Sequence, residues 1–235
     1  MIKTAVLCGG RGVRLRPITD QIPKPLIPLN GKPILEHVIS QHLRRGCHEF
    51  VVCLGYRGQA IRDFFSEHSF EGTFDFSDAG ESSSILQRIA IARPSLGDRF
   101  FVTYGDTCID VDLKEMLEQH MKQEAAVTIT TAYVQSPFGI IEHHTDNWVR
   151  SFEEKPRHIY FVGHMLMESS VIDKLDENLL SLPDGQGLIQ LFQSLIEQNK
   201  LSMNFYHGPQ ITFNTHLELA QAEKDFLSFF TYQEE

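Results

Sequence analysis

The sequence predicts an α/β fold of the Rossmann-like kind, in which helices flank a mixed but mainly parallel central sheet. Three observations lead to this prediction. Short apolar runs of strand length recur along the chain, segments with helical spacing of apolar residues separate them, and glycine- or proline-containing turns divide the two. Strands that alternate with helices build βαβ units, and βαβ units build parallel sheets.

The alternation runs through the chain without an internal repeat, a low-complexity tract or a linker, so residues 1–235 are expected to form one domain. Gly46 is expected to close the first helix, and Pro94 to stop the third. Asp146-Asn147 is expected to turn a hairpin. The expected strands cover residues 3–8, 50–54, 73–77, 100–104, 126–133, 140–142, 148–153, 160–167, 202–206 and 211–213. The expected helices cover residues 33–43, 59–65, 84–92, 113–123, 170–175, 188–198 and 217–230.

The composition is that of a globular protein with a net negative charge. Hydrophobic residues make up 42% and charged residues 22% of the 235 residues, and the formal net charge is −10. A chain of this length can bury a normal core without disulfide or metal staples. The acidic balance argues against nucleic-acid binding, which needs a basic face. A small anionic ligand is still compatible with this charge where cations are concentrated locally.

The cysteines and the hydropathy pattern indicate a cytoplasmic protein. The four cysteines form no Cys-x-x-Cys pair, and three lie in apolar, strand-like surroundings, so we expect buried free thiols in a reducing compartment. No stretch approaches the ~18 apolar residues of a membrane span, and the first residues lack the pattern of a signal peptide. We therefore expect no membrane partner. The 11 histidines show no spacing typical of a metal site.

A loop rich in glycine and arginine follows the first expected strand. It reads Cys-Gly-Gly-Arg-Gly-Val-Arg-Leu-Arg-Pro at 8–17 and is followed by Pro-Lys-Pro at 23–25. Three glycines in four positions let the backbone turn sharply and approach a ligand without interference from Cβ atoms. Arg11, Arg14, Arg16 and Lys24 crowd this stretch of an otherwise acidic chain. Backbone N–H groups beside fixed cations predict a phosphate-binding site.

A second candidate element is Asp106, which follows the expected strand at 100–104 and a glycine. In a parallel sheet, ligands bind beyond the carboxyl ends of the strands, so Asp106 and the glycine-rich loop are expected to share a site. A carboxylate that faces phosphates can hold a divalent cation that neutralises them. Asp110 and Asp112 are expected instead to cap the helix at 113–123.

Two common nucleotide-binding motifs do not fit this loop. Gly-Gly-x-Gly is not the Gly-x-Gly-x-x-Gly of dinucleotide-binding domains, Pro17 interrupts direct entry into a long helix, and no acidic residue closes the next strand to bind a ribose. A P-loop is excluded because no Gly-Lys-Ser/Thr follows the glycines. A dinucleotide-dependent oxidoreductase is therefore not expected.

The motifs, taken together, resemble the signature of sugar-1-phosphate nucleotidylyltransferases. The loop at 7–17 is joined by Pro-Lys-Pro-Leu at 23–26 and Gly-Lys-Pro-Ile-Leu at 31–35. Further matches follow in order over nearly the whole chain, at Gly55-Tyr56, Tyr104-Gly105-Asp106, Phe138-Gly139 and residues 152–156. Within this family the sequence is most similar to glucose-1-phosphate cytidylyltransferases, followed by heptose- and mannose-phosphate guanylyltransferases. The residues that carry this similarity are 55–58, 78–83, 86–88, 103–106 and 149–156.

This resemblance implies a GT-A-like nucleotidyltransferase fold and a reaction. A sugar phosphate oxygen attacks the α-phosphorus of a nucleoside triphosphate, CTP being favoured, and pyrophosphate leaves. The product is an NDP-sugar, as used in polysaccharide biosynthesis, and the cofactor implied is Mg²⁺. The partners implied are the nucleoside triphosphate and a phosphorylated small molecule, with a homo-oligomer possible because members of the family often form dimers or tetramers.

The resemblance also assigns roles to residues. Catalysis is assigned to Arg14, Lys24 and Asp106, with Asp106 and Asn214 at the metal positions. Nucleotide binding is assigned to Leu7, Gly9, Gly10, Gly12, Arg14, Lys24, Arg88 and Gly105. Sugar phosphate binding is assigned to Gly139, Glu153, Lys155 and Gly163, with Glu153 facing the sugar and Lys155 its phosphate.

The chain departs from the family pattern at three places. Asn214 stands where members carry an aspartate as second metal ligand, so weaker metal binding, or binding that relies on substrate phosphates, is expected. Glu218, one helical turn later, would have to reach back to replace it. Phe161-Val162-Gly163 replaces an Asn-Gly-Gly that reads sugar hydroxyls, which suggests a less hydroxylated substrate or one held differently. Val13 replaces a hydroxyl residue of the loop, and Ser83-Ser84 replace a glycine pair.

The sequence is therefore compatible with three functions. The first is a Mg²⁺-dependent cytidylyltransferase acting on a sugar 1-phosphate. The second is a guanylyl- or uridylyltransferase, or an enzyme that uses a non-sugar phosphate. The third is a regulatory protein that binds nucleotide without turnover, an idea motivated by Asn214 and Phe161-Val162.

Overall fold

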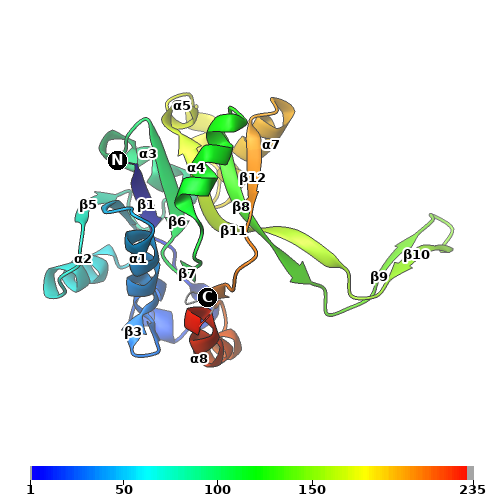
Figure 1. Ribbon diagram of the computed structural model, residues 1–235, viewed down its shortest axis with the longest axis horizontal. Helices are drawn as coiled ribbons and strands as arrows, with labels where there is room; N and C mark the ends of the chain where they lie inside the picture. Colours follow the sequence, from blue (N-terminus) through cyan, green and yellow to red (C-terminus); the bar gives the residue numbers. More distant parts are fainter. Residues whose placement is uncertain (1, 232–235) are drawn as a thin grey trace.

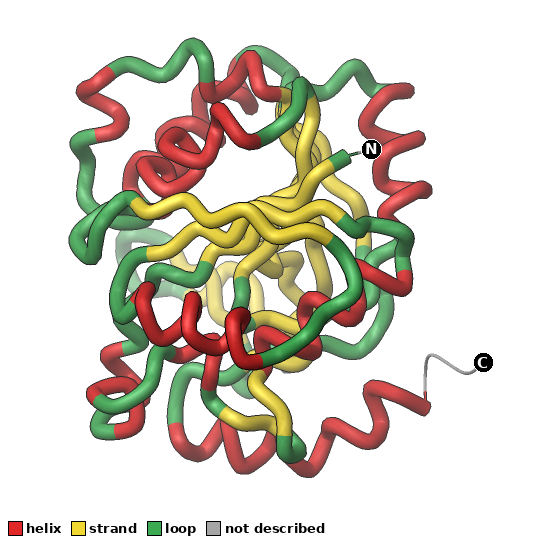
Figure 2. The backbone as a smooth tube through the Cα atoms, turned by 90° about the vertical axis from the view of Figure 1, so that its left-hand side faces the viewer, coloured by secondary structure: helices red, strands yellow, loops and turns green. Residues whose placement is uncertain are grey.

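A seven-stranded sheet with helices on both faces forms the body of the protein (Figure 1; Figure 2), in a computed structural model that describes residues 2–231. The strand between β8 and β6, which is β11, runs antiparallel to both neighbours, and the other neighbouring pairs are parallel. The predicted mixed, mainly parallel sheet is confirmed. From edge to edge its strands are β12 (Leu201–Phe205), β8 (Val127–Gln135), β11 (Arg157–Glu168), β6 (Arg99–Tyr104), β1 (Lys3–Leu7), β4 (Glu49–Leu54) and β5 (Thr73–Asp78).

The helices fall close to their expected positions. α1 ends at Arg44, and Gly46 follows with a φ of 82°, as expected of a residue that closes a helix. The helices are α1 (Ile34–Arg44), α2 (Gly58–Glu67), α3 (Ile85–Ala92), α4 (Leu113–Lys122), α5 (Ser169–Ile172), α6 (Glu177–Leu180), α7 (Gln186–Glu197) and α8 (His216–Thr231). Short 3-10 turns are η1 (Val13–Leu15), η2 (Ile18–Asp20), η3 (Lys24–Leu26) and η4 (Arg93–Ser95). Two-residue ladders join β2 (Pro28–Leu29) to β3 (Lys32–Pro33), and β7 (Thr107–Cys108) to β13 (Ile211–Thr212).

Each face of the sheet has its own core, because successive side chains of a strand point to opposite faces. On one face, Ala5 and Leu7 of β1 pack with α3, α5 and α7. On the other, Val6 of β1 packs with α1, α2 and α4. A third cluster lies between α1, β13 and α8 and contains the fully buried ring of Phe213. The third core fixes the C-terminal segment against the loop that follows β1.

The turns at helix starts show which acidic residues act as caps. Ser84 and Gln87 form a capping box at α3. Asp112 caps α4 by accepting hydrogen bonds from the backbone N–H groups of Lys114 and Glu115 at 3.0 Å each. The expectation that Asp110 also caps this helix was wrong. Its carboxylate is drawn instead to the guanidinium of Arg45, 2.7 Å away.

A two-stranded arm projects from the body (Figure 1). Strands β8 and β11 continue beyond the sheet edge and lead into the hairpin of β9 (Ile140–His143) and β10 (Val149–Glu153). The hairpin prediction around Asn147, which has a φ of 69°, is confirmed. Phe138, Trp148 and Phe152 are each more than 60% exposed on this arm.

No helix among residues 2–231 is long and apolar enough to cross a membrane. All four cysteines are free and buried, as expected.

Candidate active site

A cleft of about 680 Å³ opens at the carboxyl ends of the parallel strands, where ligands bind in such sheets. The glycine-rich loop after β1 forms one wall, and the end of β6 with residues 160–163 of β11 forms another. Residues 81–88 and 210–214 complete the lining. The expected site residues that line this cleft are Leu7, Gly9, Gly10, Gly12, Arg14, Lys24, Arg88, Asp106, Gly163 and Asn214.

The backbone of the glycine-rich loop is held close to its neighbours. The N–H of Cys8 donates to the carbonyl of Cys53 at 2.9 Å, and the carbonyl of Gly9 accepts from the N–H of Tyr56 at 3.1 Å. A Cβ atom on Gly9 would meet Nε of Arg88 at 2.4 Å. Gly12 has a φ of 59°, which side chains disfavour. The loop therefore requires glycine at these two positions for different reasons.

Arg88 lies beneath this loop as a buried cation that forms no ion pair with a carboxylate of the described residues. The residue is 4% exposed, and one terminal nitrogen donates to the carbonyl of Ser83. Its Nε finds no acceptor among the described residues. Burial lowers the pKa of Arg88, while Asp184 and two cysteine thiols oppose the shift. Arg88 lines the cleft, and its charge can be offset there by a ligand oxygen, such as that of a phosphate or a base carbonyl.

Lys24 joins the two expected metal positions. Its ammonium nitrogen lies 2.7 Å from Oδ2 of Asp106 and 3.2 Å from Oδ1 of Asn214. Arg14 donates to the same amide oxygen at 2.9 Å. Two cations therefore fix the amide oxygen of Asn214, and one of them, Lys24, also contacts Asp106. Lys24 is 7% exposed, so its charge acts in a poorly solvated part of the cleft.

The ladder between β7 and β13 brings Asp106 and Asn214 together. Thr107 pairs with Thr212, and the hydroxyl of Thr212 donates to the carbonyl of Asp106 at 3.3 Å. Glu218 does reach back from α8, but its carboxylate accepts from the backbone N–H of Asn214 at 2.7 Å. Glu218 therefore holds the backbone and leaves the amide side chain to face the cleft.

The donor set fits Mg²⁺ that is bound together with phosphates. Asp106 offers a carboxylate and Asn214 an amide oxygen, both ligand types that Mg²⁺ accepts, and Mg²⁺ usually takes its other ligands from water and phosphates. Among residues 2–231 no group of three or more His, Cys, Asp or Glu side chains forms a metal cage. The chain would thus hold such an ion through few protein ligands and a bound triphosphate.

An aromatic wall lines the substrate side of the cleft. The rings of Tyr104 and Phe161 meet edge to face at 6.1 Å. Gly163 has a φ of 80°, and a Cβ there would meet the Tyr104 ring at 2.8 Å. The hydroxyl of Tyr160 donates to Oε1 of Gln210 at 2.5 Å. Sequence reasoning missed the roles of Tyr104, Tyr160 and Gln210 in the cleft. Only Tyr104 carried a signal, because it directly precedes Gly105-Asp106.

Four expected site residues lie elsewhere. Gly105 donates its N–H to the carbonyl of Leu7 at 3.0 Å and packs against Cys8, outside the cleft lining. Gly139, Glu153 and Lys155 lie on or beside the exposed arm, because β8 and β11 carry that part of the chain away from the sheet edge (Figure 1). The structure does not bring these three residues to the cleft of the same chain.

Comparison with known proteins identifies the family of this chain. The family model described as nucleotidyl transferase matches residues 3–207. The chain belongs to the nucleotidyl transferase family. The Bacillus subtilis (strain 168) protein named probable glucose-1-phosphate cytidylyltransferase is 27% identical to this nucleotidyl transferase over 247 aligned residues, which cover 95% of each chain. The glucose-1-phosphate cytidylyltransferase of Salmonella typhimurium is 29% identical over 204 residues, which cover 75% of this chain and 79% of that one.

A solved structure supports the fold of this nucleotidyl transferase. HddC from Yersinia pseudotuberculosis, in a complex with GMP-PN, matches with a TM-score of 0.73 at 20% identity and covers 96% of this chain and 100% of that one. The family match and the named relatives confirm the resemblance to sugar-1-phosphate nucleotidyltransferases, and with it that the protein is an enzyme. Enzymes of this family generally use a divalent metal.

Proposed function

We propose that this nucleotidyl transferase moves CMP from CTP to a sugar 1-phosphate with the aid of Mg²⁺, and so makes a CDP-sugar and pyrophosphate. The observation that carries the proposal is the position of Lys24 between Asp106 and Asn214, in a cleft that the glycine-rich loop also lines. A cation, a carboxylate and backbone N–H groups converge there, as the transfer of a phosphoryl-type group requires.

The reaction needs no covalent intermediate with the protein. A phosphate oxygen of the sugar 1-phosphate forms a bond to the α-phosphorus, and the bond from that phosphorus to the bridging oxygen of the β-phosphate breaks. The electron pair leaves with pyrophosphate. Lys24 and Arg14 offset the charge that gathers on the phosphate oxygens, and the glycine-rich loop orients the triphosphate. Mg²⁺ held by Asp106 and Asn214 would supply further charge neutralisation on these oxygens.

Arg88 supports a role in nucleotide recognition. Arg88 lines the cleft beside Gly9, and no ion pair with a described residue offsets its charge, so its guanidinium would attract a nucleotide that places a hydrogen-bond acceptor in this part of the cleft. The carbonyl oxygen of a cytosine ring is such an acceptor. The choice of CTP is further supported by the two cytidylyltransferase relatives and by the short sequence motifs that resemble cytidylyltransferases.

The aromatic wall favours a second candidate substrate class. Phe161, whose ring meets that of Tyr104, stands where the family carries an asparagine that reads sugar hydroxyls. A phosphate ester with few hydroxyl groups, such as a phosphorylated alcohol, would leave fewer polar groups unpaired against these rings. We therefore propose this class as the alternative acceptor.

A substrate screen tests both proposals. Each of the four common nucleoside triphosphates is combined with Mg²⁺ and a panel of sugar phosphates and phosphorylated alcohols, and pyrophosphate release is measured. Turnover with CTP and a hexose 1-phosphate is the expected result. Turnover only with GTP or UTP contradicts the donor, turnover only with phosphorylated alcohols selects the alternative acceptor, and nucleotide binding without product in any well contradicts the transferase reaction.

A further inference from the structure

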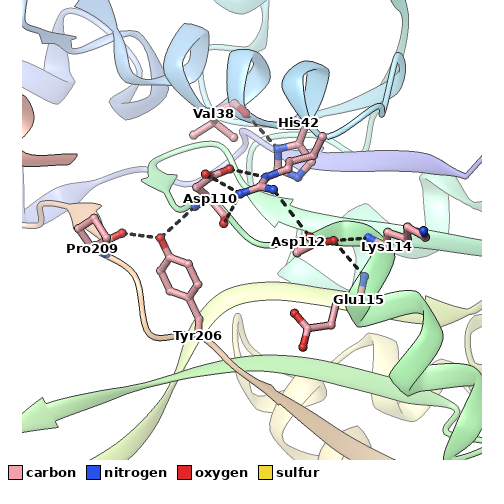
Figure 3. A network of polar contacts seen from close by, with 9 residues as sticks. Val38, His42, Asp110, Asp112, Lys114, Glu115, Tyr206 and Pro209 are labelled. Atoms are coloured by element: carbon pink, nitrogen blue, oxygen red, sulfur yellow. Dashed lines mark hydrogen bonds and ion pairs between the residues drawn. The ribbon is translucent and has the colours of Figure 1, made fainter. Parts of the chain in front are cut away.

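Tyr206 links the two chain segments that carry the expected metal ligands. The residue directly follows β12, and its backbone N–H donates to the carbonyl of Thr131 in β8 at 2.7 Å. Its hydroxyl donates to the carbonyl of Pro209 at 2.7 Å and accepts a hydrogen bond from the backbone N–H of Asp110 at 3.2 Å (Figure 3). One hydroxyl therefore ties residues 106–112 to residues 206–210.

Arg45 holds the other side of Asp110. Its Nε lies 2.7 Å from Oδ1 of the Asp110 carboxylate, and a terminal nitrogen lies 2.7 Å from Oδ2. Such a parallel, two-point pair fixes orientation as well as position. Because Arg45 directly follows α1, the pair anchors Asp110 to the body of the protein. The hydrogen bond to Asp110 also raises the pKa of Arg45, so its charge is retained.

This network stands at one end of the ladder whose other end carries Asp106 and Asn214. The ladder has two residue pairs, Thr107 with Thr212 and Cys108 with Ile211. Because its strands are antiparallel, Asp110 and Pro209 flank it on one side, and the metal positions flank it on the other. So short a ladder has little independent stability. Its geometry therefore depends on contacts outside the ladder, which are the third core that buries Cys108 and Ile211 and the hydrogen bonds at the two ends.

We propose that Tyr206 is a positioning residue for the metal site, with the Arg45–Asp110 pair as its anchor. By fixing the register of β7 against β13, the Tyr206 hydroxyl sets the distance between Asp106 and Asn214. Tyr206 is not among the residues that line the cleft. The inference rests on the proposed function in that it takes Asp106 and Asn214 as the metal ligands.

The substitution Tyr206→Phe removes the hydroxyl and keeps the ring. Binding of Mn²⁺ is measured by electron paramagnetic resonance on the whole chain with a non-hydrolysable CTP analogue. Loss of groups that orient metal ligands commonly weakens metal binding ~10- to 100-fold, and we expect at least the lower figure. The matched control is Tyr133→Phe, whose ring is half exposed against Phe205 and whose affinity for Mn²⁺ should equal that of the wild type.

Steady-state rates separate positioning from a general loss of structure. In Tyr206→Phe the Mg²⁺ concentration for half-maximal rate should rise, while KM for the nucleotide at saturating Mg²⁺ stays within a factor of two. A merely structural defect would lower the amount of active enzyme and leave the Mg²⁺ response unmoved. Mn²⁺ affinity and Mg²⁺ response equal to those of the wild type would overturn the inference.

Further variants keep the test decisive. If Tyr206→Phe does not fold, Asp110→Asn is measured in its place, because this substitution keeps the backbone N–H but weakens the pair with Arg45. Weaker Mn²⁺ binding and a higher Mg²⁺ requirement would support the inference, and wild-type values would overturn it. In another outcome, the wild type turns over no substrate and still binds Mn²⁺ at a site that Asp106→Asn abolishes. In that case the proposed function fails, and the inference is tested by the Mn²⁺ affinity of Tyr206→Phe alone. Binding of Mn²⁺ that Asp106→Asn leaves unchanged contradicts the metal site and the inference together.

Discussion

The ammonium nitrogen of Lys24 lies 2.7 Å from the carboxylate oxygen of Asp106, and only 7% of the lysine is exposed. The Asp106 side chain is 24% exposed, and its loss would leave the buried ammonium of Lys24 without a compensating charge. Each charge of this pair therefore compensates the other. Because both residues line the cleft, a substitution of either one is expected to affect both the folding of the site and its activity.

Asp106→Asn should reduce turnover by about 10² or more, as the loss of a main charge-stabilising group does. The amide cannot offer the charge that a metal and Lys24 require. Pyrophosphate release is measured at saturating substrates, with folding checked by circular dichroism. Asp146→Asn at the exposed tip of the arm is the matched control and should behave as the wild type. Activity of Asp106→Asn within a few-fold of wild type would reject its assigned role.

Asn214→Asp should tighten the apparent affinity for Mg²⁺. The amide oxygen of Asn214 already faces Lys24 and Arg14, so a carboxylate at this position adds a negative charge without a change in shape. The Mg²⁺ concentration for half-maximal rate is the measurement. An unchanged value would mean that position 214 does not face the metal.

Gly9→Ala should raise KM for the nucleotide, because the new Cβ would lie 2.4 Å from Nε of Arg88 and would displace the guanidinium. Misplacement of a binding group by about 1 Å can cost 10²-fold in rate, and we expect a loss of this order in kcat/KM. Gly97→Ala is the control, since its Cβ would meet only a carbonyl oxygen at 3.7 Å. Wild-type kinetics in Gly9→Ala would show that Arg88 does not contact the nucleotide.

Lys155→Ala tests the arm. Because Lys155 lies outside the cleft of its own chain, we expect KM for the sugar phosphate to change by less than about twofold, as for a surface charge. Measurement uses saturating nucleotide and varied sugar phosphate. A rise of tenfold or more would show that the arm reaches a cleft in solution and would restore the sequence-based assignment of this residue.

The free energy of unfolding should fall as the pH is lowered below about 6.5, the ordinary pKa of histidine. His42 and His164 are buried with their rings 5.6 Å apart, and burial lowers the pKa of both. Because Nδ1 of His42 lies 3.0 Å from the carbonyl of Val38, it must carry the proton and donate it. Nε2 of each ring finds no hydrogen-bond partner among the described residues.

The sign follows from proton uptake. Below pH 6.5 the unfolded chain protonates these histidines and the folded chain does not, so the stability present above that pH is lost as the pH falls. Urea unfolding at pH 7.5 and 5.5 measures the difference. His164→Met should make it smaller, whereas His144→Gln in the exposed hairpin turn should leave it unchanged. An equal pH dependence in His164→Met and wild type would contradict the prediction.

The sequence alone predicted the order of strands and helices and the place of the glycine-rich loop. These features are local, because apolar periodicity, glycine and proline report the conformation of a few adjacent residues. The resemblance to the family was likewise carried by short motifs, and it correctly placed Lys24, Asp106 and Asn214 in one cleft although nearly 200 residues separate them.

Only the tertiary structure decided how those residues contact one another and what supports them. Three contacts join segments that no local pattern connects. They are the ion pair of Lys24 with Asp106, the hydrogen bond that the backbone N–H of Asp110 donates to the Tyr206 hydroxyl, and the hydrogen bond that the backbone N–H of Asn214 donates to Glu218. The same reason explains the error at Asp110, which has the sequence context of a helix cap but lies beside Arg45, the residue that follows α1. A nearby guanidinium outweighed the local preference, because a two-point charged pair is stronger than a capping bond.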